Sequence, residues 1–233
     1  MRDCCTCSGE QTCHNGAIAL DASHMVYLGR AACELVPGDA AGASELLVDM
    51  LRATACWRAG RLWTTEMIWH DQVDDQLALL GLTAPPGYGW SEYIATYGPA
   101  PAMTPVSASA SGPHDEDLLR RVVDESSRHP TLLVTNDEDL FAQARQRTFE
   151  FGTVGFSSEN STSMMVRLLH CGAIPRDVVD ACLVAEHKNI EQMRQAGMRQ
   201  RKYDIKTRRL DRACQQLVLR DFDHDWSPEE TGE

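Results

Sequence analysis

Two short, mainly apolar runs that each lead into acidic residues constrain this 233-residue chain more than any other feature. Ala17–Leu20 is followed at once by Asp21, and Thr131–Val134 by a polar stretch that ends at Asp137. Short runs of this kind, bounded by polar residues, indicate buried strands. Helical patterns lie between and after them, and strands that alternate with helices favour an α/β fold with a mainly parallel central sheet.

The remaining elements are predicted from apolar periodicity and from the breaks in it. Apolar residues at helical spacing predict a series of helices, and two weaker runs predict further short strands. The helices are expected at 25–33, 44–57, 67–80, 115–128, 140–148, 163–171, 176–197 and 199–219, and the strands at 62–65 and 153–156. Residues 98–113 (GPAPAMTPVSASASGP) are typical of a low-complexity linker or loop insertion.

The composition supports a folded core and limits the classes of function. Hydrophobic residues make up 43% of the chain, no apolar stretch is long enough to span a bilayer, and the N-terminus lacks the apolar segment of a signal peptide. Five cysteines scattered among helical patterns resemble small buried hydrophobes, which favours a reducing compartment and hence the cytoplasm. The net charge of -12 argues against a general nucleic-acid-binding protein, but not against a nuclease with a local basic wall and bound cations.

The acids that follow the two apolar runs are the strongest indication of function. In parallel sheets ligands bind outside the carboxyl ends of the strands, so neighbouring strands would bring Asp21 and Asp137 into one crevice. Carboxylates that lie close together repel one another, and a bound cation relieves that repulsion. Their hard oxygen atoms select Mg²⁺ or Mn²⁺, which can activate a water against a phosphodiester. The structural alternative is that both aspartates form turns or helix N-caps.

Three segments resemble the motifs of the PIN-domain family of nucleases. Residues 19–23 (ALDAS) resemble its opening strand, where an acid leads into a helix, and residues 132–140 (LLVTNDEDL) resemble its later strand with a T-x-D-x-D signature. Between them, residues 63–72 (WTTEMIWHDQ) resemble the segment that bears the second acid. Asp71 holds that position, where the family usually has Glu, and Glu66 is the fallback.

The third acid of the family stands at the start of the helix that precedes the T-x-D strand. In residues 114–118 (HDEDL) we assign it to Asp117, which comes directly before the apolar stripe, and we take Asp115 as the helix N-cap. A weaker likeness to one PIN subgroup continues over residues 144–175, where a Gly-Thr-x-Gly turn precedes a helix that ends near Ile174.

The resemblance implies a fold, a domain organisation and an activity. The fold is a three-layer, PIN-like α/β fold, with a Cys-rich tail over 1–15, a nuclease domain over 16–156 and a helical extension over 157–233. The activity is that of an endoribonuclease that uses Mg²⁺ or Mn²⁺, as in the toxin half of a toxin–antitoxin pair. The implied partners are the RNA substrate, an antitoxin or another protein, and a second copy of the chain in a homodimer, with no membrane.

The implied site combines acids with hydroxyl and basic side chains. The residues expected to hold the metal and to act in catalysis are Asp21, Asp71, Asp117 and Asp137. Asp139 is either a further metal ligand or a surface residue. Contacts to the substrate are expected from Ser23, Thr135, Asn136, Arg199, Arg201 and Lys202. Ser23 and Thr135 would donate hydrogen bonds to the carboxylates or to a phosphate, or else satisfy local backbone groups.

Two clusters outside the motifs have both a functional and a structural interpretation. Near the N-terminus, ligands for one Zn²⁺ are available from Cys4, Cys7, Cys13 and His14. Their spacing is poor for a structural zinc site, so a flexible tail is the favoured interpretation. Basic residues gather over 194–212, which predicts either a grip on RNA phosphates or a solvated helix face that pairs with acids.

Two other functions are compatible with the same residues. A PIN-like module that has lost nuclease activity would bind RNA or protein, and the departure at Asp71 together with the net acidity keeps this alternative open. An unrelated phosphotransfer or phosphatase domain would use Asp21, but it needs a second aspartate two residues on, where Ser23 stands.

Overall fold

The computed structural model describes most of the chain, in two compact units. The described residues are 16–58, 61–65, 68, 72–84, 90, 114–151 and 155–225. The first unit is Met1–Ala185 and the second is Glu186–Glu233.

A four-stranded parallel sheet forms the centre of the first unit. Its strands are β1 (Ala17–Leu20), β2 (Arg61–Trp63), β3 (Thr131–Val134) and β4 (Phe156–Glu159), in the order β2-β1-β3-β4. β1 and β3 are buried along their whole length, as expected for apolar strands that are flanked on both sides. The register pairs the last residue of β1 with the last residue of β3, so the residues that follow both strands leave the sheet at the same level.

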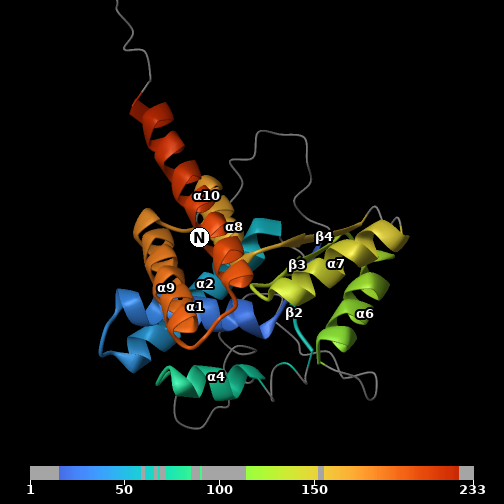
Figure 1. The fold of residues 1–233 in the computed structure, drawn as a ribbon, viewed down its shortest axis with the longest axis horizontal. Coiled ribbons are helices and arrows are strands. Elements are labelled where there is room, and N and C mark those ends of the chain that lie inside the picture. The colour runs from blue at the N-terminus through green and yellow to red at the C-terminus, as the bar shows by residue number, and fades with distance from the viewer. Residues whose placement is uncertain are drawn as a thin grey trace, which may run out of the picture. The chain divides into compact units, whose positions relative to one another are not determined.

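Helices cover both faces of this sheet, which gives three layers (Figure 1). On one face, α2 (Ala40–Arg58) contacts β1, α1 (Ala22–Leu35) and α8 (Ser161–His170). On the other face, α6 (His114–Ser126) contacts β3, β4 and α7 (Glu138–Phe151). This division agrees with the general rule that crossovers between parallel strands are right-handed, because the chain moves in opposite directions along the sheet before and after β2. The predicted α/β class and parallel sheet are confirmed.

The packing around α1 forms a large part of the core. Met25 and Leu28 of this helix are fully buried, and the short helix α4 (Asp74–Leu79) buries Leu77 against the same region. Gly29 makes this approach possible, since a Cβ atom there would stand 2.9 Å from Leu77 Cδ2. The position of α1 is therefore fixed on several sides, and so is the start of the helix, where the acid after β1 stands.

Strand β4 lies three residues later than the sequence predicts. The predicted strand is 153–156, whereas the structure has a turn at Gly155 and a strand from Phe156. β4 is an edge strand, and its residues after Phe156 are polar and at least partly exposed, so no apolar run marks it. Gly155 itself packs tightly, because a Cβ atom there would stand 2.7 Å from the backbone oxygen of Ser126.

The unit boundary also lies later than the predicted boundary at 157. β4 extends across that point, and α8 and the first half of α9 (Arg176–Gln195) belong to the first unit. The helical extension as a separate unit therefore begins at Glu186.

The second unit consists of the end of α9 and the long helix α10 (Gln200–Asp225). Gly197 reverses the chain between them with a φ of 93°, a conformation that favours glycine. The Tyr203 hydroxyl donates a 2.9 Å hydrogen bond to Glu191, and the Arg194 guanidinium stacks 4.6 Å from the Tyr203 ring centroid. Among the described residues, no helix is both long and apolar enough to cross a membrane.

Candidate active site

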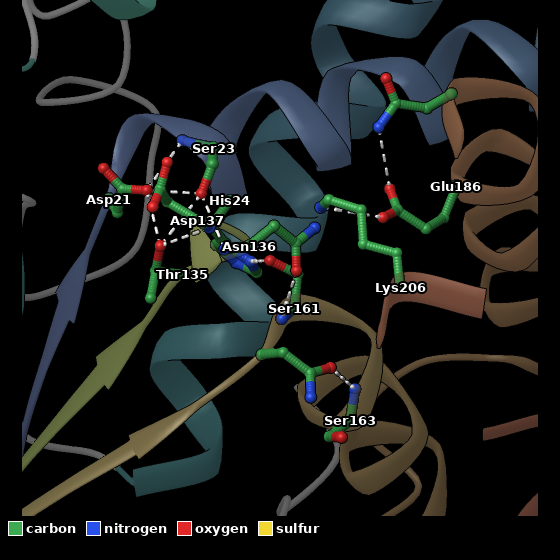
Figure 2. A network of polar contacts seen from close by, with 12 residues as sticks. Asp21, Ser23, His24, Thr135, Asn136, Asp137, Ser161, Ser163, Glu186 and Lys206 are labelled. Atoms are coloured by element: carbon green, nitrogen blue, oxygen red, sulfur yellow. Dashed lines mark hydrogen bonds and ion pairs between the residues drawn. The ribbon is translucent and has the colours of Figure 1, made fainter. Parts of the chain in front are cut away.

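The carboxylate of Asp21 lies at the carboxyl end of the sheet and is almost fully buried, with 4% of the residue exposed. Asp21 follows β1 directly and caps the N-terminus of α1, where its Oδ2 atom accepts the backbone N–H of Ser23 at 3.3 Å. The same oxygen accepts the hydroxyls of Ser23 and Thr135, the latter at 2.8 Å (Figure 2). Three donors therefore converge on one oxygen and fix the orientation of the carboxylate.

The two hydroxyl groups also hold the backbone that follows β3. Ser23 Oγ accepts the N–H of Asn136 at 2.8 Å, and Thr135 Oγ1 accepts the N–H of Asp137 at 2.9 Å. Each hydroxyl has one proton, and in both cases this proton is donated to Asp21. Ser23 and Thr135 therefore combine the two roles expected from the sequence, since they donate to the carboxylate of Asp21 and also satisfy local backbone groups.

Asp137 caps the helix that follows β3 in the same way as Asp21 caps α1. Its Oδ1 atom accepts the backbone N–H of Asp139 at 2.7 Å and that of Leu140 at 2.9 Å. Both predicted acids are therefore helix caps, as the structural alternative proposes. Capping uses one oxygen of each carboxylate, and within the described part of the chain Asp21 Oδ1 and Asp137 Oδ2 accept no hydrogen bond. One oxygen per carboxylate remains for a ligand.

The acids of this region act on one another electrostatically. Burial raises the pKa of Asp21, and the negative charge of Asp137 raises it further, against the lowering effect of the hydrogen bonds from Ser23 and Thr135. Burial also raises the pKa of Asp115, and so do the charges of Asp21, Asp137 and Asp139, while His114 lowers it. Four carboxylates, from β1, β3 and the first turns of α6 and α7, thus share one negative field.

Asp115 is the residue of α6 whose carboxyl group is shown to take part in this field. Asp117 is buried and its Oδ2 atom lies 3.4 Å from Arg121 Nε, one turn further along the same helix. Helix α6 begins at His114, so Asp115 lies in its first turn and not at the N-cap position that we expected.

The position of Asp115 on the helix could have been found from the spacing of the apolar residues that follow it. It lies three, four and seven residues before Leu118, Leu119 and Val122, which are all buried, so it shares their helix face.

A buried histidine is connected to the site through a chain of hydrogen bonds. His24 of α1 is fully buried, and its Nδ1 atom lies 2.9 Å from Ser161 Oγ. The backbone N–H of Ser161 donates to Asn136 Oδ1 at 3.0 Å, so His24 is linked through α8 to the segment between Thr135 and Asp137 (Figure 2). Burial lowers the pKa of His24 to about 3, which keeps the imidazole neutral and unsuited to shuttle protons at physiological pH.

The remaining predicted residues are placed in the second unit or lie outside the described residues. Arg199, Arg201 and Lys202 lie at the start of α10, in the second unit. Asp71 and its alternative Glu66 lie outside the described residues, and so do 98–113 and the cluster formed by Cys4, Cys7, Cys13 and His14.

The donors present suit a hard divalent cation. The unused carboxylate oxygens of Asp21 and Asp137, together with Asp115, are the ligand type that Mg²⁺ and Mn²⁺ prefer, and their mutual repulsion is the cost that a cation would offset. Within the described ranges, no three His, Cys, Asp or Glu side chains stand close enough together to hold a metal ion.

Comparisons with known proteins do not add to this picture. No family model, no curated protein and no solved structure matches the chain. The likeness to PIN domains therefore depends on the sequence motifs alone and stays a prediction.

Proposed function

We propose that this protein is a Mg²⁺- or Mn²⁺-dependent endoribonuclease of the PIN type. The observation that carries the proposal is the linkage of Asp21 to the backbone of Asp137 through one side chain, Thr135, at the carboxyl edge of the sheet. With Asp115 in the same field, acids from three separate segments would hold the cation. A group of carboxylates whose burial and mutual repulsion raise their pKa values is a feature of functional sites more often than of structural ones.

The residues divide into those that would hold the metal and those that hold these acids in place. Asp21, Asp115 and Asp137 would hold the cation partly through bound water, because no three such side chains of the described residues stand close enough together to ligate it jointly. Asp71 is a fourth acid from the predicted motif. A bound cation would lower the pKa of a coordinated water and stabilise the charge of a phosphodiester under attack. Ser23 and Thr135 keep Asp21 in one rotamer, and Asn136 ties the segment before Asp137 to α8. These contacts fix the orientation of the acids that would hold the metal.

Cleavage of single-stranded RNA tests the proposal directly. The wild-type chain is expected to cleave in Mn²⁺ or Mg²⁺ and to stop in EDTA, and Asp21→Asn and Asp137→Asn are expected to abolish cleavage. Asparagine caps helices about as well as aspartate, so both variants should keep the helical circular dichroism of the wild type. A folded wild type that binds RNA without cutting it would support the inactive module instead.

The comparison of Asp115→Asn with Asp117→Asn tests which acid of α6 acts. Loss of Asp115 is expected to lower cleavage by more than the about 10- to 100-fold typical of a residue that only supports a metal ligand. Loss of the buried Asp117 charge is expected to leave cleavage within that range, and to lower the free energy of unfolding by about 1–3 kcal/mol because Arg121 loses its partner. The reverse order of activities would restore the assignment made from the sequence.

A further inference from the structure

One helix of the second unit carries a concentration of positive charge that the rest of the chain lacks. Residues 199–212 contain seven basic and two acidic residues, a net charge of +5. The whole chain has a net charge of -12, so the remainder carries -17. A local reversal of this size in an acidic chain is an electrostatic footprint for an anionic partner.

Three exposed arginines of α10 form a line along one side of the helix. Arg201, Arg208 and Arg212 are separated by seven and four residues, so they point within about 40° of one another and extend over about 16 Å. The opposite side of the helix is the buried stripe of Leu210, Ala213 and Leu217. We call these three arginines the arginine row.

The members of the arginine row are exposed side chains without partners in the part of the chain that the structure describes. The structure gives none of its three members an ion pair or a hydrogen bond through the side chain within the described residues. By contrast, several exposed arginines of the first unit pair with a carboxylate of their own helix, as Arg52 does with Asp49 and Arg120 with Glu116.

The helix that carries the arginine row is held rigidly. Lys206 lies 3.8 Å from Glu186, and the two side chains are 10% and 8% exposed, so this ion pair is largely removed from water (Figure 2). Asn189 donates to Glu186 at 3.3 Å, which satisfies a further oxygen of the carboxylate. Together with the contacts of Tyr203 to Glu191 and Arg194, these bonds tie the two helices of the hairpin together. A guanidinium on such a frame loses less freedom on binding than one on a loop.

We propose that the arginine row is a binding surface for the phosphate backbone of single-stranded RNA. This inference rests on the proposed function, because it names a second contact for the substrate of that function, on the second unit. Arginine matches phosphate through paired N–H groups, and three of them in a line fit a repeating chain of phosphates. At about 3.4 Å per phosphate, the row spans about five nucleotides of a stacked strand. The row includes Arg201 of the predicted trio. Arg199 directly precedes α10, and Lys202, as the next residue after Arg201, points in a different direction.

Binding is tested in a chain that cannot cut. In the Asp21→Asn/Asp137→Asn background and in EDTA, fluorescence anisotropy of a labelled, unstructured RNA is measured between about 50 and 200 mM salt. Removal of three phosphate contacts by R201Q/R208Q/R212Q should reduce the slope of log affinity against log salt by about 2, at about 0.7 per contact. Over this range the parent should therefore lose about 20-fold more affinity than the variant. The matched control R52Q/R120Q/R176Q removes the same charge from arginines that are paired with Asp49, Glu116 and Asp180, and should keep the parental slope.

The outcomes separate this inference from the proposed function. A chain that cleaves RNA but whose arginine-row variant keeps the parental slope refutes the inference alone. A chain that does not cleave RNA, but binds it in a manner that depends on the row, refutes the proposed function alone. Equal affinity for poly-glutamate and RNA would overturn the assignment to nucleic acid in favour of an acidic protein partner. R201K/R208K/R212K should keep most of the slope, because the charge is retained.

Discussion

Acidification should destabilise the first unit through His24. Burial lowers the pKa of this imidazole from 6.5 to about 3. Between these two pH values the unfolded chain binds a proton at His24 and the folded chain does not. The free energy of unfolding is therefore at its full value above pH 6.5, and it falls as the pH decreases from there towards 3. At pH 5, which is 1.5 units below the unfolded value, the loss amounts to about 2 kcal/mol at about 1.4 kcal/mol per unit. That is a large share of the about 5–15 kcal/mol that stabilises a typical domain.

Urea denaturation at pH 7 and pH 5 measures this loss, with the fluorescence of the buried Trp63 and Trp90 as the signal. His24→Asn removes the titrating group and keeps an atom in reach of Ser161, so the difference between the two pH values should shrink by about 2 kcal/mol. His187→Asn, at an exposed position, serves as the control for the replacement of a histidine by asparagine. If the wild type and His24→Asn lose the same stability between pH 7 and pH 5, the burial argument for His24 is refuted.

Two further predictions concern the close packing of β4 and the charge of Asp21. Gly155→Ala should lower the free energy of unfolding by about 1–3 kcal/mol, because its Cβ would stand 2.7 Å from the backbone oxygen of Ser126; an unchanged denaturation midpoint would contradict this. Asp21→Asn should unfold in EDTA at pH 7 at the same temperature as the wild type or a higher one, since a raised carboxyl pKa means that ionisation opposes folding above the unfolded value of 3.8. Added Mn²⁺ should then raise the melting temperature of the wild type alone, and a variant that melts several degrees lower in EDTA would count against the pKa argument.

The central strands could be predicted from the sequence to the residue, and the edge strand could not. β1 and β3 are buried on both faces, so their apolar runs have sharp polar boundaries. β4 has one neighbour only, and Ser157 to Glu159 are polar because part of the strand faces water. An apolar pattern in the sequence reflects burial, so a strand that buries few side chains cannot be located from such a pattern.

The two capping acids of the site could be predicted from the sequence, but the residues that surround and orient them could not. Asp21 and Asp137 follow apolar runs, and this position alone indicates the carboxyl edge of a sheet. The choice between Asp115 and Asp117 depends on the rotation of α6, because two residues along a helix correspond to about 200°. The contact of His24 with Ser161 joins residues 137 apart, and only the tertiary packing of α1 beside α8 brings them together.

The double use of Asp21 and Asp137 separates the architecture of the protein from its chemistry. One oxygen of each carboxylate caps the start of a helix, and an asparagine amide caps a helix equally well. The other oxygen of each carboxylate is left for a ligand. A change of one nucleotide, from an aspartate codon to an asparagine codon, would thus remove the charged oxygen that is left for a ligand and leave the scaffold intact. If the proposed function holds, a single such change would turn the enzyme into a protein that binds RNA without cutting it, and no loss of stability would accompany the change.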